Sequence, residues 1–162
     1  MRRWGFWIVL LGILAAVNGL IAHKESVLRS GQRMLLRLAP VDPRSLMQGD
    51  YMVLAYEAAR SVPVTGLPGD GRLVVAVDAN DVARFVRIHG GGPLAPGEHL
   101  LRYRVRGQVQ LGAESFFFQE GHAGRYENAR YGELRIRADG SSVLVGLCDE
   151  NRRTLGGPQS PQ

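Results

Sequence analysis

Hydrophobic and polar residues alternate along several stretches of the chain, most clearly from Leu101 to Leu111. Leucine, tyrosine and valine stand at odd positions there, whereas arginine and glutamine fill the even ones. A period of two residues predicts a β-strand with one buried and one solvated face. The continuous apolar run Leu73–Val77 instead predicts a strand that is covered on both faces.

Further strand patterns are separated by short stretches rich in glycine and proline. They cover Arg33–Leu38, Tyr51–Glu57, Ala83–His89, Glu133–Ala138 and Ser142–Leu147. Asp139-Gly140 predicts a hairpin turn between the last two. Helix signals are few in this part, and only residues 124–129 suit a turn or a short helix. We therefore predict a mainly β (α+β), compact antiparallel domain over residues 33–150 and a disordered tail over residues 151–162.

A different pattern opens the chain. Fifteen of the 19 residues from Trp4 to Ala22 are Ala, Val, Ile, Leu, Phe or Trp, and none is charged. A helix of this length extends about 28 Å, close to the ~30 Å hydrocarbon thickness of a bilayer. Residues 1–22 are thus predicted to form a short cytoplasmic start and a transmembrane anchor, followed by a stalk over residues 23–32. Because Arg2 and Arg3 precede the segment, the positive-inside rule places the rest of the chain outside the cytoplasm.

A cleaved signal peptide is the alternative to a retained anchor, since both begin with positive charge and an apolar run. Leu20, two residues before Ala22, is bulky for a cleavage site. The apolar run also exceeds the usual length of a signal-peptide core, roughly 7–15 residues. Both features favour the retained anchor.

Small residues form a line along the predicted membrane helix. Gly5, Gly12 and Gly19 recur every seven residues, and Ala16 falls near the same side. Such a line lets a second helix approach closely, so it is a candidate docking face for a partner's membrane helix. Glycine is also common in membrane helices in general, which leaves an interpretation without a partner open.

Charge and cysteine content narrow the classes of partner. Arg2 and Arg3 contribute two of the formal net charge of +5, which leaves +3 on the remainder and no dense basic run. We therefore predict no nucleic-acid partner. Cys148 is the only cysteine, so an intramolecular disulfide is excluded, and no cysteine follows the apolar segment where a lipid is attached.

The wet face of the strand Leu101–Leu111 is basic. Its arginines, together with two on the strand Glu133–Ala138, form a candidate stripe for acidic partners or lipid headgroups. These residues are Arg102, Arg104, Arg106, Arg135 and Arg137. The preferred interpretation is a solvated face balanced by glutamates, namely Glu98, Glu114 and Glu133. Phe116, Phe117 and Phe118 are consecutive, so a strand there must point the middle ring away from its neighbours.

One loop carries residue types that bind metals. Glu120, His122 and Glu127 offer two carboxylates and an imidazole, which suit zinc or manganese. This loop supports the alternative function, a hydrolase or metal-dependent enzyme. No recognised metal-motif spacing accompanies it. A solvated loop in which the acids pair with Arg125 and Arg130 is preferred, and we predict no metal and no cofactor.

The segment QGDYMVLAYE joins a turn to a strand. Gly49 and Asp50 suit a tight turn through backbone freedom and a local carboxylate acceptor, and alternation places Leu54 and Tyr56 in the core. With Tyr51, these residues match the pattern for which the GDYxxLxY family is named, so the chain resembles that family. VDPRSLMQGDY is similar to its lead-in and GAESFFFQEGHAGRYENAR to its second block.

The resemblance implies a membrane-anchored bacterial domain, encoded beside or joined to multi-spanning membrane proteins, and carries over no catalytic residue. The lead-in also looks a little like that of signal peptidases and self-cleaving repressors. However, Val41 stands near the place of the nucleophilic serine, Ser45 follows the proline, and the only lysine, Lys24, lies beside the anchor. Serine-lysine catalysis is therefore disfavoured.

We accordingly expect an accessory or interaction module more than an enzyme. It would cross the bacterial inner (cytoplasmic) membrane once, with its N-terminus in the cytoplasm and its β domain in the periplasm. Its expected partners are the lipid bilayer and a multi-spanning membrane protein.

Overall fold

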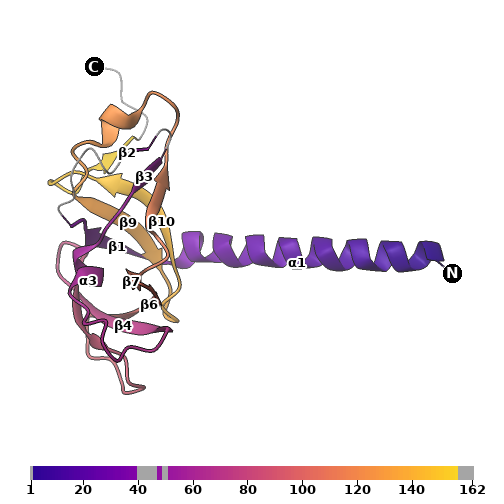
Figure 1. Ribbon diagram of the computed structural model, residues 1–162, viewed down its shortest axis with the longest axis horizontal. Coiled ribbons are helices and arrows are strands. Elements are labelled where there is room, and N and C mark those ends of the chain that lie inside the picture. Colours follow the sequence, from indigo (N-terminus) through magenta and orange to yellow (C-terminus); the bar gives the residue numbers. More distant parts are fainter. Residues whose placement is uncertain (1, 40–46, 49–50, 157–162) are drawn as a thin grey trace.

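A long helix projects from one side of a β-rich body in the computed structural model, which describes residues 2–39, 47–48 and 51–156 (Figure 1). The helix, α1 (Arg2–Ser30), continues through most of the segment expected as a stalk. No proline or glycine interrupts residues 23–30, and Gly31 follows the last helical residue. Within the described residues, no helix combines the length and the apolar character that crossing a bilayer requires.

Eight strands build one large sheet in the order β11-β10-β9-β1-β5-β4-β6-β7. Their bounds are β1 (Gln32–Arg37), β4 (Asp70–Val77), β5 (Val82–Ile88), β6 (Glu98–Arg106), β7 (Gln108–Gln110), β9 (Tyr131–Ile136), β10 (Ser142–Cys148) and β11 (Thr154–Leu155). A small sheet has the order β2-β3-β8, with β2 (Met47–Gln48), β3 (Tyr51–Val53) and β8 (Ser115–Phe117). Two single helical turns, α3 (Glu57–Arg60) and the 3-10 turn η1 (Ala123–Tyr126), complete the described elements.

The mainly β prediction is confirmed, but the large sheet is mixed and not purely antiparallel. β1 and β5 run parallel, with Leu35 opposite Val82, whereas the other paired strands are antiparallel. Parallel neighbours need a long crossover connection. Residues 38–81, which include β3, α3 and β4, supply it. Sequence periodicity identifies strands but not their neighbours, so this pair was not visible in the pattern.

Gly107 divides the stretch that was predicted as one strand, Leu101–Leu111. Its φ of 74° is a backbone conformation that glycine adopts without strain. The chain reverses there, and Val105 of β6 lies opposite Val109 of β7. Opposite residues share a face of the sheet, so the reversal keeps odd positions on one side. The alternation therefore continued unbroken through a turn.

Two other boundaries differ from the expected ones. The predicted strand Tyr51–Glu57 is a strand only to Val53, and Glu57 begins α3. The expected disordered tail is ordered at Thr154–Leu155, which pair with β10; residues 157–162 lie outside the described residues. The hairpin between β9 and β10 is confirmed.

Buried side chains of both sheets meet in one core on the inner face of the large sheet. It includes Leu36, Leu73, Leu101, Leu134 and Leu147, all with 0% exposure. Val74, on the outer face of β4, also has 0% exposure. The prediction that the Leu73–Val77 run is covered on both faces is thus confirmed at its centre.

Candidate functional site

Tyr56 and Leu54 of the motif are core residues, as predicted. The Tyr56 side chain has 1% exposure, and its hydroxyl donates a hydrogen bond to the carbonyl oxygen of Ala113 at 2.6 Å. Burial, with a smaller effect of the Glu114 charge, raises the pKa of Tyr56. The buried Leu54 donates its backbone N–H to the carbonyl oxygen of Glu114 at 2.7 Å. Both residues therefore fasten the segment after β3 to residues 113–114.

Tyr51 lies on the outer face of the small sheet. It is half-buried, opposite Phe117, and the two ring centroids are 5.7 Å apart. Phe117 is 73% exposed, so the middle of the three phenylalanines does point away from its neighbours. Gly49 and Asp50 lie outside the described residues. The described part of the motif serves the fold, and it holds no cluster of catalytic groups.

Gly132 on β9 leaves the space that the Tyr56 ring fills. A Cβ at this position would lie 2.9 Å from Cε1 and 3.0 Å from the hydroxyl oxygen of Tyr56. Because the ring is fully enclosed, Gly132→Ala is expected to lower the free energy of unfolding by about 1–3 kcal/mol through overpacking. Urea unfolding of the full chain measures this. Gly90→Ala, which meets open space, is the control, and an equal effect of both changes would contradict the close fit.

The candidate metal loop does not form a metal cluster. Glu120 and Glu127 are exposed, and His122 is half-buried before η1. In the described residues, no three His, Cys, Asp or Glu side chains lie close enough to hold a metal ion. The expected pairing of the two glutamates with Arg125 and Arg130 is absent from the ion pairs of the described chain.

The small-residue line lies on an uncovered part of α1. A Cβ on Gly12 or Gly19 would meet nothing within 4 Å, and Ala16 is exposed. Gly5 belongs to the same helix. The line therefore makes no contact within this chain at the positions that the structure describes.

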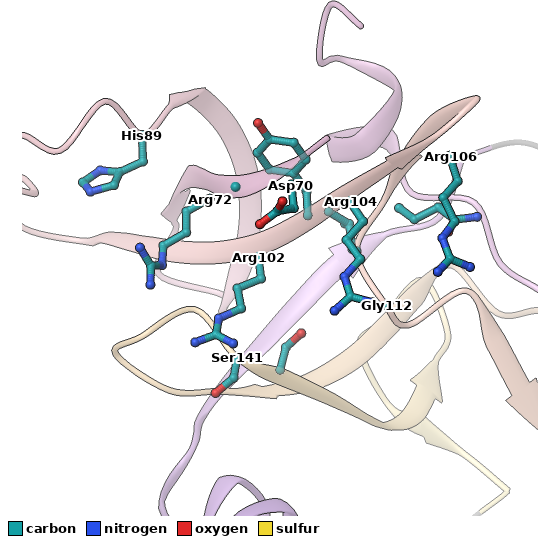
Figure 2. Close-up of a pocket in the computed structure, with 13 residues that line it drawn as sticks. Asp70, Arg72, His89, Arg102, Arg104, Arg106, Gly112 and Ser141 are labelled. Carbon is teal, nitrogen blue, oxygen red and sulfur yellow. The ribbon is translucent and has the colours of Figure 1, made fainter. Parts of the chain in front are cut away.

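Four arginines come together on the outer face of the large sheet, around a hollow of about 800 Å³ (Figure 2). Arg72 comes from β4, and Arg102, Arg104 and Arg106 come from β6. Asp70 and His89 are also part of the lining, as are Ser141 and Ser142 of the β9–β10 hairpin. All four arginines are exposed. We call this feature the arginine hollow.

Strand register explains why these residues share a face. Arg72 lies directly opposite Arg102, and Asp70 opposite Arg104. Two like charges in direct opposition are unfavourable, and Asp139 at the β9–β10 turn offsets this. The Asp139 carboxylate accepts a hydrogen bond from Arg102 Nη2 at 2.7 Å, and the Asp139 backbone carbonyl oxygen accepts one from Arg72 Nε at 3.1 Å.

The pKa of Asp139 is held below its usual value, first by the hydroxyl of Ser141 and further by the Ser141 backbone N–H and the charge of Arg102. Asp139 is therefore a charged acceptor at neutral pH. Asp139, in the β9–β10 hairpin, thereby stabilises Arg72 of β4 and Arg102 of β6. No local sequence pattern predicted this contact, because the hairpin is distant in sequence from both strands.

The glutamates expected to balance the basic face are engaged elsewhere. Glu98 pairs with Arg87, and Glu133 pairs with Arg33. Glu114 accepts from the backbone N–H groups of Leu111 and Gly112. Among the described residues, neither Arg104 nor Arg106 has an ion pair or a hydrogen bond to a side chain. The prediction of a solvated face is therefore confirmed for Arg104 and Arg106, whereas the prediction that glutamates balance their charge was wrong.

The root of α1 lies on the same outer face. Arg137 Nη1 donates to Ser26 Oγ at 3.1 Å, and Arg135 Nη1 donates to the carbonyl oxygen of Gly31 at 3.4 Å. The predicted stripe thus separates into two groups. Arg135 and Arg137 hold the helix, whereas the β6 arginines face the hollow.

A second charged cluster is buried beside β1. Glu133 has 8% exposure, and its carboxylate accepts from Arg33 Nε at 3.0 Å, Cys148 Sγ at 3.4 Å and Thr154 Oγ1 at 3.3 Å. Desolvation opposes ionisation, but Arg33 and the two other donors hold the pKa of Glu133 below its usual value. Burial and the nearby carboxylate raise the pKa of Cys148. Every member has a partner, so the cluster is a structural network.

Comparison with known families gives one match. A family model described as GDYXXLXY protein matches residues 13–147. Searches of curated proteins and of solved structures gave no significant match.

Proposed function

The chain belongs to the GDYXXLXY protein family, and from this premise we propose that it is a membrane-anchored accessory module. In this proposal α1 is a single membrane anchor that is retained in the mature protein. The β domain lies on the extracytoplasmic side, and it acts together with a multi-spanning membrane protein. No catalytic step is assigned to it.

The observation that carries the proposal is the surface of α1. Eleven large apolar side chains between Trp4 and Ile21 are 47–78% exposed, and the helix projects away from the body (Figure 1). It meets the large sheet through β9 and β10 near its end. An apolar surface of this extent requires a cover of lipid or protein. The anchor proposal therefore rests on the exposed apolar side chains of α1. It does not rest on the overall hydropathy of the described helix.

The distribution of apolar residues around α1 favours lipid as the main cover. Neighbouring positions such as Phe6, Trp7, Ile8 and Val9 are all exposed, so the apolar surface extends around the helix. A helix that docked on one soluble partner would have a polar face opposite its apolar one. Arg2 and Arg3 before the apolar run favour the cytoplasm for the N-terminus.

Charges placed in the middle of α1 test the anchor. Each aspartate at a helix centre costs about 2.5–3.5 kcal/mol of insertion free energy, so L11D combined with L14D is expected to move the protein from the membrane to the soluble fraction. Carbonate extraction of cell membranes measures this. Val64→Asp, at an exposed apolar site of the β domain, is the control. Complete extraction of the wild-type chain would refute the anchor.

The small-residue line on α1 supports the proposal of a partner membrane helix. Gly12, Ala16 and Gly19 present open space to a neighbouring helix, and close packing of small residues stabilises helix pairs in lipid. G12I combined with G19I is expected to abolish crosslinking to a multi-spanning protein in native membranes while carbonate resistance is kept. Leu14→Ile preserves volume and is the control. Recovery of the same partner with the double variant would exclude this face.

A further inference from the structure

We propose that the arginine hollow binds the phosphate groups of anionic lipids, so that the outer face of the large sheet lies on the bilayer surface. The hollow would then fix how the β domain stands on the membrane. This inference rests on the proposed function, because it requires α1 to be inserted in lipid.

The length of α1 beyond its apolar run determines how far the large sheet lies from the hydrocarbon layer of the bilayer. Ser26 follows Ala22, the last residue of the run, by four positions, or about 6 Å of helix. The headgroup layer on each side of the hydrocarbon is about 5–8 Å thick. Arg137 of the β domain contacts Ser26 at 3.1 Å. The outer face of the sheet therefore begins at the level of the lipid phosphates.

The hairpin between β9 and β10 connects this contact to the hollow. The backbone N–H of Arg137 donates to the carbonyl oxygen of Ser141 at 3.0 Å, and that of Arg102 donates to Gly140 at 3.0 Å. Ser141 also lines the hollow. A Cβ on Gly140 would lie 3.2 Å from Cβ of Leu100, so the turn packs tightly on β6. The helix root and the arginines thus belong to one hydrogen-bonded unit.

The charges of the hollow match phosphate. Four arginines and one carboxylate, that of Asp70, line it, and the Asp139 carboxylate beside the lining pairs with Arg102. Arg104 and Arg106 have no ion-pair partner in the described chain, and Figure 2 shows their guanidinium groups on the same side of β6 as that of Arg102. A guanidinium presents a planar fork of donors that suits phosphate oxygens. Basic residues beside a membrane helix are attracted to anionic lipid by this mechanism.

The full chain, reconstituted in vesicles of phosphatidylcholine and phosphatidylglycerol, tests the inference. Electron paramagnetic resonance of spin-labelled lipids measures the association constant of each lipid with the protein. We expect phosphatidylglycerol to be preferred over phosphatidylcholine by roughly fivefold or more, because each arginine near the surface contributes about that factor. R104Q combined with R106Q is expected to remove the preference, and 1 M NaCl to weaken it.

R125Q combined with R130Q is the matched control. It removes the same charge from two exposed arginines near η1, the orange turn at the end of the domain in Figure 1, and it is expected to keep the preference. Thermal unfolding of all variants confirms that they are folded. An equal loss in the control would show that net charge, and not the hollow, attracts the lipid, and would overturn the inference.

Other outcomes separate this inference from the anchor. Carbonate-resistant wild-type protein without preference for phosphatidylglycerol would overturn the headgroup site and leave the anchor intact. Protein that carbonate extracts from neutral vesicles would overturn the anchor and the inference with it. Saturable binding of inorganic phosphate that is lost in R104Q/R106Q, without any lipid preference, would assign the hollow to a free anion and overturn the lipid assignment.

Discussion

Replacing Tyr56 by alanine is expected to lower the free energy of unfolding of the β domain by about 3–5 kcal/mol. The ring is 1% exposed and packs against Gly132, so its removal leaves a cavity between the two sheets. It also leaves the buried carbonyl oxygen of Ala113 without its donor. Tyr56→Phe removes only the hydroxyl and is expected to cost about 1–3 kcal/mol. Urea unfolding of the full chain in detergent micelles, followed by far-UV circular dichroism, measures both.

Tyr51→Ala is the matched control within the same motif. Tyr51 is half-buried and its ring lies against the exposed ring of Phe117, so its loss is expected to cost at most about 1 kcal/mol. An equal cost at Tyr51 and Tyr56 would contradict the different roles of the two tyrosines. If the predicted order is found, the second tyrosine of the motif is needed for packing. The first lies on the outer face of the small sheet, opposite Phe117.

Glu133→Gln is expected to lower the free energy of unfolding at pH 7 by about 2–3 kcal/mol. Loss of one member of a buried ion pair costs about 3–5 kcal/mol when the pair is fully enclosed. Arg33 keeps 32% side-chain exposure, so solvent screens part of this effect. Chemical unfolding at pH 7 measures the difference between the variant and the wild type. Glu150→Gln, at an exposed position, is expected to change stability by less than about 0.5 kcal/mol.

The same pair predicts a dependence on pH. Arg33 holds the pKa of Glu133 in the folded protein below its usual value, which is about 4.3 in an unfolded chain. The folded state therefore binds the proton less readily than the unfolded state. The stability difference between wild type and Glu133→Gln should be full above about pH 4.3 and shrink as the pH falls through the lower folded pKa. A difference that is as large at pH 3 as at pH 7 would contradict a charged Glu133.

The strands were largely predictable because each records its burial in local alternation. β1, β4, β5, β9 and β10 all coincide with predicted strands to within a few residues. The turn at Gly107 escaped because residues that pair across a hairpin share a face, so alternation passes through the reversal unchanged. The β11 strand escaped because two residues are too few to show a period.

The candidate site was predictable only in part. Alternation indicated correctly that Arg102, Arg104 and Arg106 share an exposed face. The balancing acids were assigned wrongly, because closeness in sequence does not determine which carboxylate a guanidinium meets. Asp139 reaches Arg102 across 37 positions of sequence, and Arg33 reaches Glu133 across 100. The buried position of Glu133 also departs from the rule that charged residues on a strand face solvent.

The sequence by itself determined the family, the mainly β class and the apolar helix at the start of the chain, since motif, period and composition are local properties. Tertiary structure decided the parallel pair of β1 with β5, the partners of the arginines and the place where α1 meets the sheet. Each of these depends on contacts between segments far apart in the chain, and such contacts follow from packing in three dimensions, which a one-dimensional pattern does not record.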